Sequence, residues 1–204
     1  MPCYAFEGFV PVVDATSFVH PTASLIGDVQ VGAHCYIGPG ASLRGDFGRI
    51  VLSEGVNVQD NCVLHSFPGQ DVMLEQDAHV GHAAVLHGCH VRRGALIGIS
   101  AVLMDGVEVG EYSFVGASSF VREAMVIPAR SLALGSPARV VRVLTDAEIS
   151  WKAEGTAIYQ RLAARCLASW AECAPLPVVE PNRPRRERDQ TVPLGDFKTS
   201  RLAK

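Results

Sequence analysis

Aliphatic residues recur every six positions along most of this chain. A period of six fits neither a helix of 3.6 residues per turn nor the simple alternation of a strand. It fits short strands with one inward side chain each, three of which close a triangular coil of about 18 residues. A sandwich would place turn signals every ~8–12 residues and would not hold one period this long. The pattern therefore predicts an all-β solenoid, the hexapeptide type of parallel β-helix, built on Val19, Leu25, Val31, Ile37, Leu43, Leu52, Val58, Leu64, Leu74, Val80, Leu86, Val91, Ile97, Leu103, Val109, Val115, Val121 and Ile127.

Glycine often follows the aliphatic residue directly, as in Val31-Gly32 and Ile97-Gly98. We expect these glycines at the corners of the coil, where the backbone conformation is restricted.

The six-residue period breaks twice. Nine residues separate Leu43 from Leu52, and ten separate Leu64 from Leu74. Insertions into a solenoid emerge as loops, and loops on a rigid scaffold often carry function. Both breaks are therefore predicted to be loops that contribute to a site.

The pattern changes to that of a helix after residue 140. Thr145 and Glu148 have the spacing of a capping box at a helix N-terminus. We divide the chain into a solenoid over 1–140, a C-terminal helix over 141–173 and an extended Pro- and Arg-rich tail over 174–204. A helix along or across the solenoid is expected, because an open β-helix end leaves strand edges unpaired.

Composition excludes several classes of partner. The chain has 204 residues and a formal net charge of −3, which argues against general binding of nucleic acid. An apolar run of ~18–20 residues is missing, so we expect no contact with a membrane. The N-terminal residues do not resemble a signal peptide, and the six cysteines are dispersed. These features predict a cytoplasmic protein with reduced, buried cysteines.

Histidines gather in one coil of the predicted solenoid. His65 follows Leu64 and His87 follows Leu86, one coil later, so both are expected at the same corner. His82 belongs to a different edge, which a single rod cannot bring to the other two. Rods packed as a threefold trimer can, and three imidazoles with an open fourth position are typical of catalytic zinc. Fe²⁺ and Co²⁺ accept the same ligands as Zn²⁺.

A histidine taken by itself is more often an ordinary hydrogen-bonding residue than a metal ligand. We give this interpretation to His20, His34, His79 and His90.

Several motifs together resemble a known family, the γ-class carbonic anhydrase-like hexapeptide-repeat proteins. Within it the chain is most similar to the hexapeptide proteins of phenylacetic-acid degradation and to their relatives of the carnitine operon. The motifs are Arg44-Gly45-Asp46, Asn57-Val58-Gln59-Asp60-Asn61-Cys62-Val63-Leu64-His65 and Gly81-His82-(x)4-His87-Gly88-Cys89, with Ser17–Ala23, Leu43–Ile50, His65–Asp71 and Gly135–Ala138 for the closer likeness.

This resemblance implies a homotrimer of left-handed β-helices with a metal ion at each subunit interface. His65, His82 and His87 match the family's metal ligands, and Gln59 matches a residue that positions the metal-bound water. Arg44 and Asp60 match a charged pair across the interface, and Asp46 belongs to the same network. A purely structural role in the trimer is the alternative for Arg44 and Asp60.

The resemblance to the phenylacetate proteins implies a metal-dependent acyl-CoA thioesterase. Metal-bound hydroxide would attack the thioester carbonyl. Phe47 and Phe67, one from each break in the period, would line an apolar acyl pocket or simply pack the loops. The arginines of the 174–204 tail, or Arg92 and Arg93, are candidates for contact with the phosphates of coenzyme A.

Three alternatives stay open. The first is a γ-class carbonic anhydrase acting on CO2 and bicarbonate, although Phe47 stands where the archetypal enzyme carries a proton-relaying glutamate. The second is a hexapeptide acyltransferase, which uses one histidine base and needs no metal. The third is a metal-free structural protein that keeps the scaffold.

Overall fold

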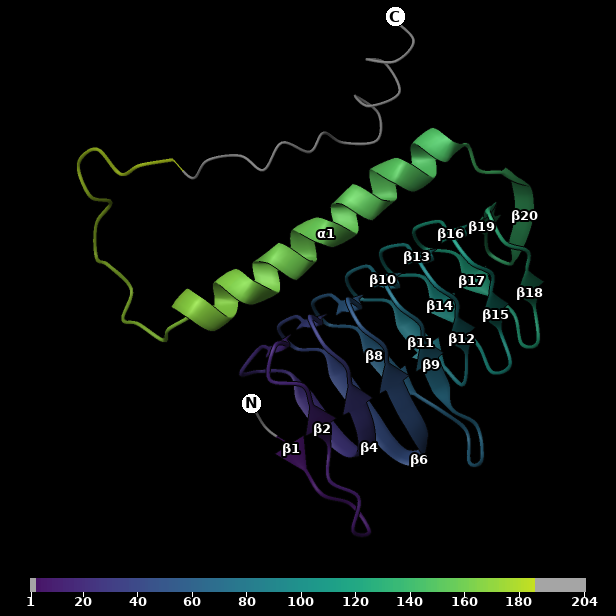
Figure 1. The fold of residues 1–204 in the computed structure, drawn as a ribbon, viewed down its shortest axis with the longest axis horizontal. Helices are drawn as coiled ribbons and strands as arrows, with labels where there is room; N and C mark the ends of the chain where they lie inside the picture. The colour runs from purple at the N-terminus through teal and green to yellow at the C-terminus, as the bar shows by residue number, and fades with distance from the viewer. Residues whose placement is uncertain (1–2, 186–204) are drawn as a thin grey trace, which may run out of the picture.

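The computed structural model describes residues 3–185, and the statements below concern that range. It is a parallel β-solenoid followed by one long helix that runs back along the coils (Figure 1). The predicted all-β solenoid with a C-terminal helix is therefore confirmed. No helix of residues 3–185 combines the length and the apolar character that crossing a bilayer requires.

Three faces make up the solenoid, which we call the first, second and third face. The first face carries β8 (Val63–His65), β11 (Val85–His87), β14 (Val102–Leu103) and β17 (Phe120–Val121). The second carries β9 (Val72–Leu74), β12 (His90–Val91), β15 (Glu108–Val109) and β18 (Val126–Ile127). The third carries β3 (Phe18–Val19), β5 (Tyr36–Ile37), β7 (Asn57–Val58), β10 (His79–Val80), β13 (Leu96–Ile97), β16 (Phe114–Val115) and β19 (Ser131–Gly135).

Two long strands join the first face to the second near the N-terminus. They are β4 (Ser24–Val31) and β6 (Ser42–Leu52), which pair in parallel. Two short strands, β1 (Cys3–Tyr4) and β2 (Val12–Val13), pair with β4. At the other end β20 (Ala138–Val143) turns back antiparallel on β19.

The six-residue series forms the core, as predicted. Every aliphatic residue of that series is at most 9% exposed, and most are fully buried. Cys35, Cys62 and Cys89 lie in the same interior, which confirms the prediction of buried cysteines for these three. Cys3 and Cys173 are instead exposed, so the prediction of buried cysteines is wrong for these two.

The glycines that follow the aliphatic residues have a different role from the one expected. The left-handed backbone conformation falls further along each turn, for example at Ser100 with φ 57°. A Cβ on Gly98 would lie 2.5 Å from the backbone nitrogen of Ala117, on the next coil. Glycine is therefore required there by the close approach of adjacent coils.

The first break in the period is a strand and not a loop. Residues 44–49 lie inside β6, whose eleven residues run without interruption around the corner between the first and second faces. The pairing partner β4 makes the same crossing with fewer residues, so the register shifts between Gly27 and Val29 and residues 46–49 bulge from the ladder without a partner on β4. The second break does form the predicted loop, over residues 66–71, and it projects from the same corner (Figure 1).

Helix α1 (Asp146–Ser169) covers the third face and contacts β3, β5 and β7. Its N-terminus has the predicted capping box between Thr145 and Glu148. It is shorter than the range 141–173, because Val141–Val143 still belong to β20. Residues 174–185 of the predicted tail are exposed and contain no helix or strand, and 186–204 lie outside the described residues.

Candidate functional site

His65 and His87 lie in register on neighbouring strands at the end of the first face. β8 and β11 pair in parallel with His65 opposite His87, as the strand count predicted. His65 Nδ1 lies 3.3 Å from His87 Nε2, and the ring centroids are 5.3 Å apart. The two imidazoles thus face each other through one nitrogen each.

A carboxylate holds the outer nitrogen of each ring. Asp46 Oδ1 lies 3.0 Å from His65 Nε2, and Asp105 Oδ1 lies 2.8 Å from His87 Nδ1. Partial burial acts to raise the pKa of Asp46, but hydrogen bonds from Arg44 and His65 hold it below its ordinary value. Asp46 is therefore an anionic acceptor, and the ring nitrogens that face the carboxylates carry the protons.

The proton assignment leaves two lone pairs opposed at 3.3 Å. Such a pair repels unless a proton or a cation lies between the nitrogens. Two imidazoles on a tetrahedral metal with bonds of about 2.0–2.1 Å place their nitrogens about 3.3–3.4 Å apart. The pair at His65 and His87 therefore fits two ligands of one divalent cation, and the carboxylates are the outer partners that metal-bound histidines usually have.

One chain supplies only part of such a centre. Among residues 3–185 the structure brings together no three His, Cys, Asp or Glu side chains that could hold a metal ion. The predicted third ligand, His82, lies between β10 and β11, at the start of the first face, whereas His87 ends β11. His82 Nδ1 lies 2.5 Å from Asp60 Oδ2, and both side chains are partly exposed, at 43% and 36%.

An apolar ladder connects these two corners. Val63, Val85, Val102 and Phe120 are aligned in consecutive registers on the outer side of the first face. Val63 is 41% exposed and Phe120 is 37% exposed, and α1 covers the third face instead. The first face thus carries the His65–His87 pair at one edge, His82 at the other, and between them an apolar surface that no helix of residues 3–185 covers.

The predicted charged pair between Arg44 and Asp60 is not formed within one chain. Arg44 Nη1 lies 2.7 Å from Asp46 Oδ2, and Asp60 pairs with His82. Arg44 thereby joins the network that orients His65. A contact between Arg44 and Asp60 of neighbouring copies stays a prediction.

Both predicted substrate-binding aromatics are exposed near the histidine pair. The Phe47 ring lies 5.3 Å from the His65 ring, and Phe47 is 53% exposed on strand β6. Phe67 is 63% exposed on the 66–71 loop, whose Gly69 N–H donates to the Phe47 carbonyl at 3.4 Å. Gly48 permits this packing, because a Cβ there would lie 1.7 Å from the Gln70 carbonyl oxygen.

Gln59 lies on a different face from the His65–His87 pair. It is 3% exposed at the end of β7 on the third face, where its Nε2 donates to Asn57 Oδ1 at 3.1 Å. The same nitrogen lies 2.7 Å from His79 Nε2, and His79 Nδ1 is 3.3 Å from Thr156 Oγ1 of α1. His79 is thus a hydrogen-bonding residue, as predicted, with Gln59 and Thr156 as its partners. The sequence indicates this position, because counting strands places His79 opposite Asn57 on the neighbouring coil.

The middle of α1 carries a buried lysine that the sequence pattern did not indicate. Lys152 on α1 is 4% exposed, and its Nζ donates to the Asp77 carbonyl oxygen at 2.6 Å. Burial lowers the pKa of Lys152 to about 7, although the Asp77 carboxylate acts to raise it. A pocket of about 180 Å³ lies beside it between α1 and the coils, with Tyr112 and Gln160 in its wall.

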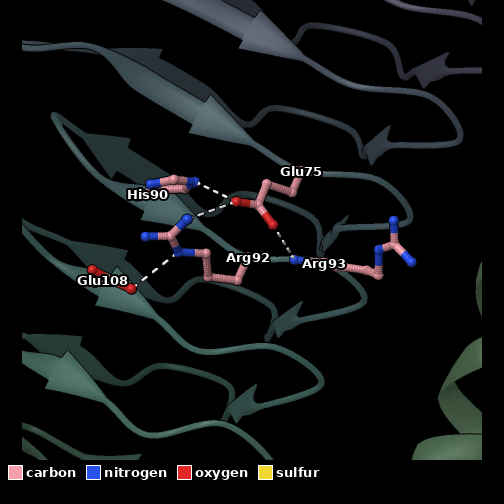
Figure 2. A network of polar contacts seen from close by, with 5 residues as sticks. All are labelled: Glu75, His90, Arg92, Arg93 and Glu108. Atoms are coloured by element: carbon pink, nitrogen blue, oxygen red, sulfur yellow. Dashed lines mark hydrogen bonds and ion pairs between the residues drawn. The ribbon is translucent and has the colours of Figure 1, made fainter.

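Arg92 and Arg93, the candidates for contact with coenzyme A phosphates, lie on the second face, and carboxylates already pair with Arg92 there. Figure 2 shows Arg92 between two carboxylates, with Nη1 2.9 Å from Glu75 and Nε 3.0 Å from Glu108. His90 also pairs with Glu75, at 2.8 Å. Arg92 is therefore neutralised, whereas the Arg93 guanidinium points away from this network (Figure 2).

Comparisons with known proteins agree with this fold. No protein-family model matches the chain. The chain is 53% identical over 185 residues to the carnitine operon protein CaiE of Salmonella agona, which covers 91% of this chain and 93% of that protein. The predicted likeness to carnitine-operon proteins is thus confirmed, while the likenesses to γ-class carbonic anhydrases and to phenylacetate degradation proteins stay predictions.

Two solved structures are also similar. One is described as a putative acetyltransferase of Bacillus cereus, with a TM-score of 0.80, 34% identity and coverage of 81% of this chain and 96% of that chain. The other is a hexapeptide transferase family protein of Anaplasma phagocytophilum, with a TM-score of 0.77, 31% identity and coverage of 79% and 96%.

Proposed function

Because this chain belongs to the CaiE family of hexapeptide-repeat proteins, we propose that it is an enzyme of acyl-thioester chemistry with a metal-assisted site shared between copies of the chain. The reaction we propose first is hydrolysis of an acyl-CoA. The observation that carries this proposal is the opposition of His65 Nδ1 and His87 Nε2 at 3.3 Å, each ring anchored by a carboxylate on its far side.

The site is completed by His82 of a second copy. Three features support this arrangement: the pair at one edge of the first face, the partly exposed His82 at the other edge, and the apolar ladder between them. A triangular rod with one apolar face packs most simply as a closed trimer, in which every copy gives both edges to different neighbours. The proposed partner is therefore this chain itself, as a homotrimer.

The residues have separate roles in the proposed reaction. A divalent cation held by three imidazoles would polarise a carbonyl and make water a better nucleophile at neutral pH. Asp46 and Asp105 keep the inward lone pairs of His65 and His87 free for it. Phe47 beside His65, with the exposed Phe67, offers apolar surface to an acyl group.

The second candidate is acyl transfer to a hydroxyl or amine acceptor. The descriptions of the Bacillus and Anaplasma structures favour transfer over hydrolysis. In this reaction a histidine of the pair would act as the base that deprotonates the acceptor, and no cation would be needed. Carbonic anhydrase activity is a third candidate, which would use the same site with CO2 as the substrate.

One set of assays separates these candidates. Thiol release from phenylacetyl-CoA and other acyl-CoA esters is measured with Zn²⁺-loaded protein, with and without a chelator, and CO2 hydration is measured in parallel. Release that needs the cation supports hydrolysis. Release that needs an added amine or alcohol and ignores the chelator supports the transferase, and CO2 hydration without thiol release supports the third candidate.

Mixing inactive variants tests the shared site. His82→Ala and His87→Ala each lack one ligand, but a mixed trimer of the two contains some interfaces with all three histidines. We expect activity to return in co-expressed mixtures and not in either variant alone. Wild-type activity in His82→Ala alone would contradict the shared site, with His34→Ala as a control at an exposed histidine away from it.

A further inference from the structure

The amide of Gln59 is held in a buried cluster under α1. Asn57 is 1% exposed, Gln59 3% and Thr156 2%, so the polar atoms of this cluster are shielded from water, and Asn57 Nδ2 has no hydrogen-bond partner there. The next residue, Asp60, is the carboxylate that pairs with His82. Gln59 therefore lies on the edge of the third face that carries the His82 half of the proposed site.

Both hydrogens of the Gln59 amide nitrogen have acceptors in this cluster. Nε2 lies 3.1 Å from Asn57 Oδ1 and 2.7 Å from His79 Nε2. A neutral imidazole has one donor and one acceptor nitrogen. With His79 Nε2 as the acceptor, the ring proton lies on Nδ1, which faces Thr156 Oγ1.

The surroundings keep His79 neutral. Burial, and then the charge of Lys152 and of His82, lower the pKa of His79 to about 3. The Tyr159 ring packs edge-on against it at 5.4 Å between centroids. A neutral His79 with its proton on Nδ1 has no proton on Nε2 to donate to Gln59, and the Thr156 hydroxyl is placed to accept the Nδ1 proton.

We propose that His79 is a positioning residue that fixes the Gln59 amide with its nitrogen inward, so that the carbonyl oxygen is the end left free at the His82 edge. This inference rests on the proposed function and sharpens it. A free carbonyl oxygen accepts a hydrogen bond from water and can orient the attacking molecule. An amide nitrogen turned the same way would instead stabilise an oxyanion, and the two roles exclude each other.

The tautomer of His79 tests this orientation without any assay of activity. We would record long-range ¹H–¹⁵N correlations of ¹⁵N-histidine-labelled protein and assign His79 by its loss in His79→Phe. Protonated Nδ1 and bare Nε2 between pH 6 and 8 are expected. Protonated Nε2 would overturn the proposal, because Gln59 would then turn its oxygen inward.

Gln59→Glu gives a second test by the same measurement. A carboxylate cannot donate, so the proton of His79 should move to Nε2 in this variant, and an unchanged tautomer would contradict the proposal. In the kinetic test, His79→Phe should lower kcat for thioester hydrolysis by at least about tenfold with KM nearly unchanged. A rise in KM with kcat unchanged would contradict the positioning role.

The matched control is Thr156→Ser, which keeps the hydroxyl and should keep both the tautomer and kcat. If the expected tautomer is found and thioester hydrolysis is absent, the proposed function fails and the orientation of Gln59 stands. If hydrolysis is present and the tautomer is reversed, the orientation fails and the proposed function stands.

Discussion

Lys152 Nζ lies 2.6 Å from the Asp77 carbonyl oxygen, which joins the middle of α1 to a turn of the third face. Lys152 is 4% exposed, and the hydrocarbon part of its side chain lies between the helix and the coils. A lysine in this position costs stability while it is charged, because the charged form is disfavoured by burial.

The first prediction concerns stability and pH. The folded pKa of Lys152 is about 7, against an ordinary value of 10.5, so between these values the unfolded chain binds a proton that the folded chain does not. The free energy of unfolding should therefore rise with pH in this window, by up to about 1.4 kcal/mol per pH unit. In Lys152→Met the rise should be flatter, as measured by urea unfolding at pH 7, 8 and 9. Equal slopes in both proteins would contradict the prediction, with Thr156→Ser as the control.

The second prediction concerns the outer partners of the histidine pair. Asp105→Asn should weaken Zn²⁺ binding by about 10–100-fold, because His87 loses the acceptor that fixes its tautomer. Competition with a coloured chelator measures the affinity. Glu75→Gln alters the matching partner of His90 on the second face and should leave Zn²⁺ affinity unchanged. A loss of the same size in both variants would show a general effect of removing charge.

The third prediction concerns the apolar ladder. Val102→Asp places a charge in the middle of the first face, and we expect it to dissociate the oligomer while the far-ultraviolet circular dichroism stays that of a β-solenoid. Sedimentation velocity reports the change in mass. Val126→Asp is the control on the second face, where the side chain is already 63% exposed. If Val102→Asp has the same mass as the wild type, another surface forms the interface.

The fourth prediction separates two kinds of glycine. Gly98→Ala should lower the free energy of unfolding by about 1–3 kcal/mol, because its Cβ would meet the Ala117 backbone nitrogen at 2.5 Å. Gly155→Ala, on α1 with no atom within 4 Å of the added Cβ, should instead raise it by about 0.5–1 kcal/mol. Chemical unfolding of both variants measures the difference, and equal signs would contradict it.

Much of the fold follows from the sequence because one rule repeats. Each coil has the same three inward positions, so the pattern of neighbouring coils shows where the inward positions of an irregular coil must lie. The alignment of His65 with His87 then follows from counting strands. The first break was misjudged for a physical reason. β6 pairs with β4 on both sides of the extra residues, so residues 46–49 are taken up as a bulge within one strand instead of leaving it as a loop.

The surroundings of Gln59 could not be read in the same way. They depend on where α1 lies, and the helix has no strong apolar stripe: its buried residues include Glu148, Lys152 and Thr156. When charged residues occupy buried positions of a helix, the face that packs cannot be recognised from the hydrophobic pattern. Pairings within the first face are local to neighbouring coils, whereas the contact of His79 with Thr156 spans 77 residues.

The return path of α1 has a consequence for how the molecule unfolds and is made. In a stack of coils each layer contacts only its neighbours, so such arrays tend to fray from their ends. Here Ala163 and Cys166 pack on Phe18 and Tyr36, and Gln160 donates to the Gly55 carbonyl oxygen. The first coils therefore lose contacts whenever the last helix detaches, and the array is expected to melt as one cooperative unit. During synthesis α1 emerges after all of the coils. The third face of the first coils therefore stays uncovered until the helix has been made.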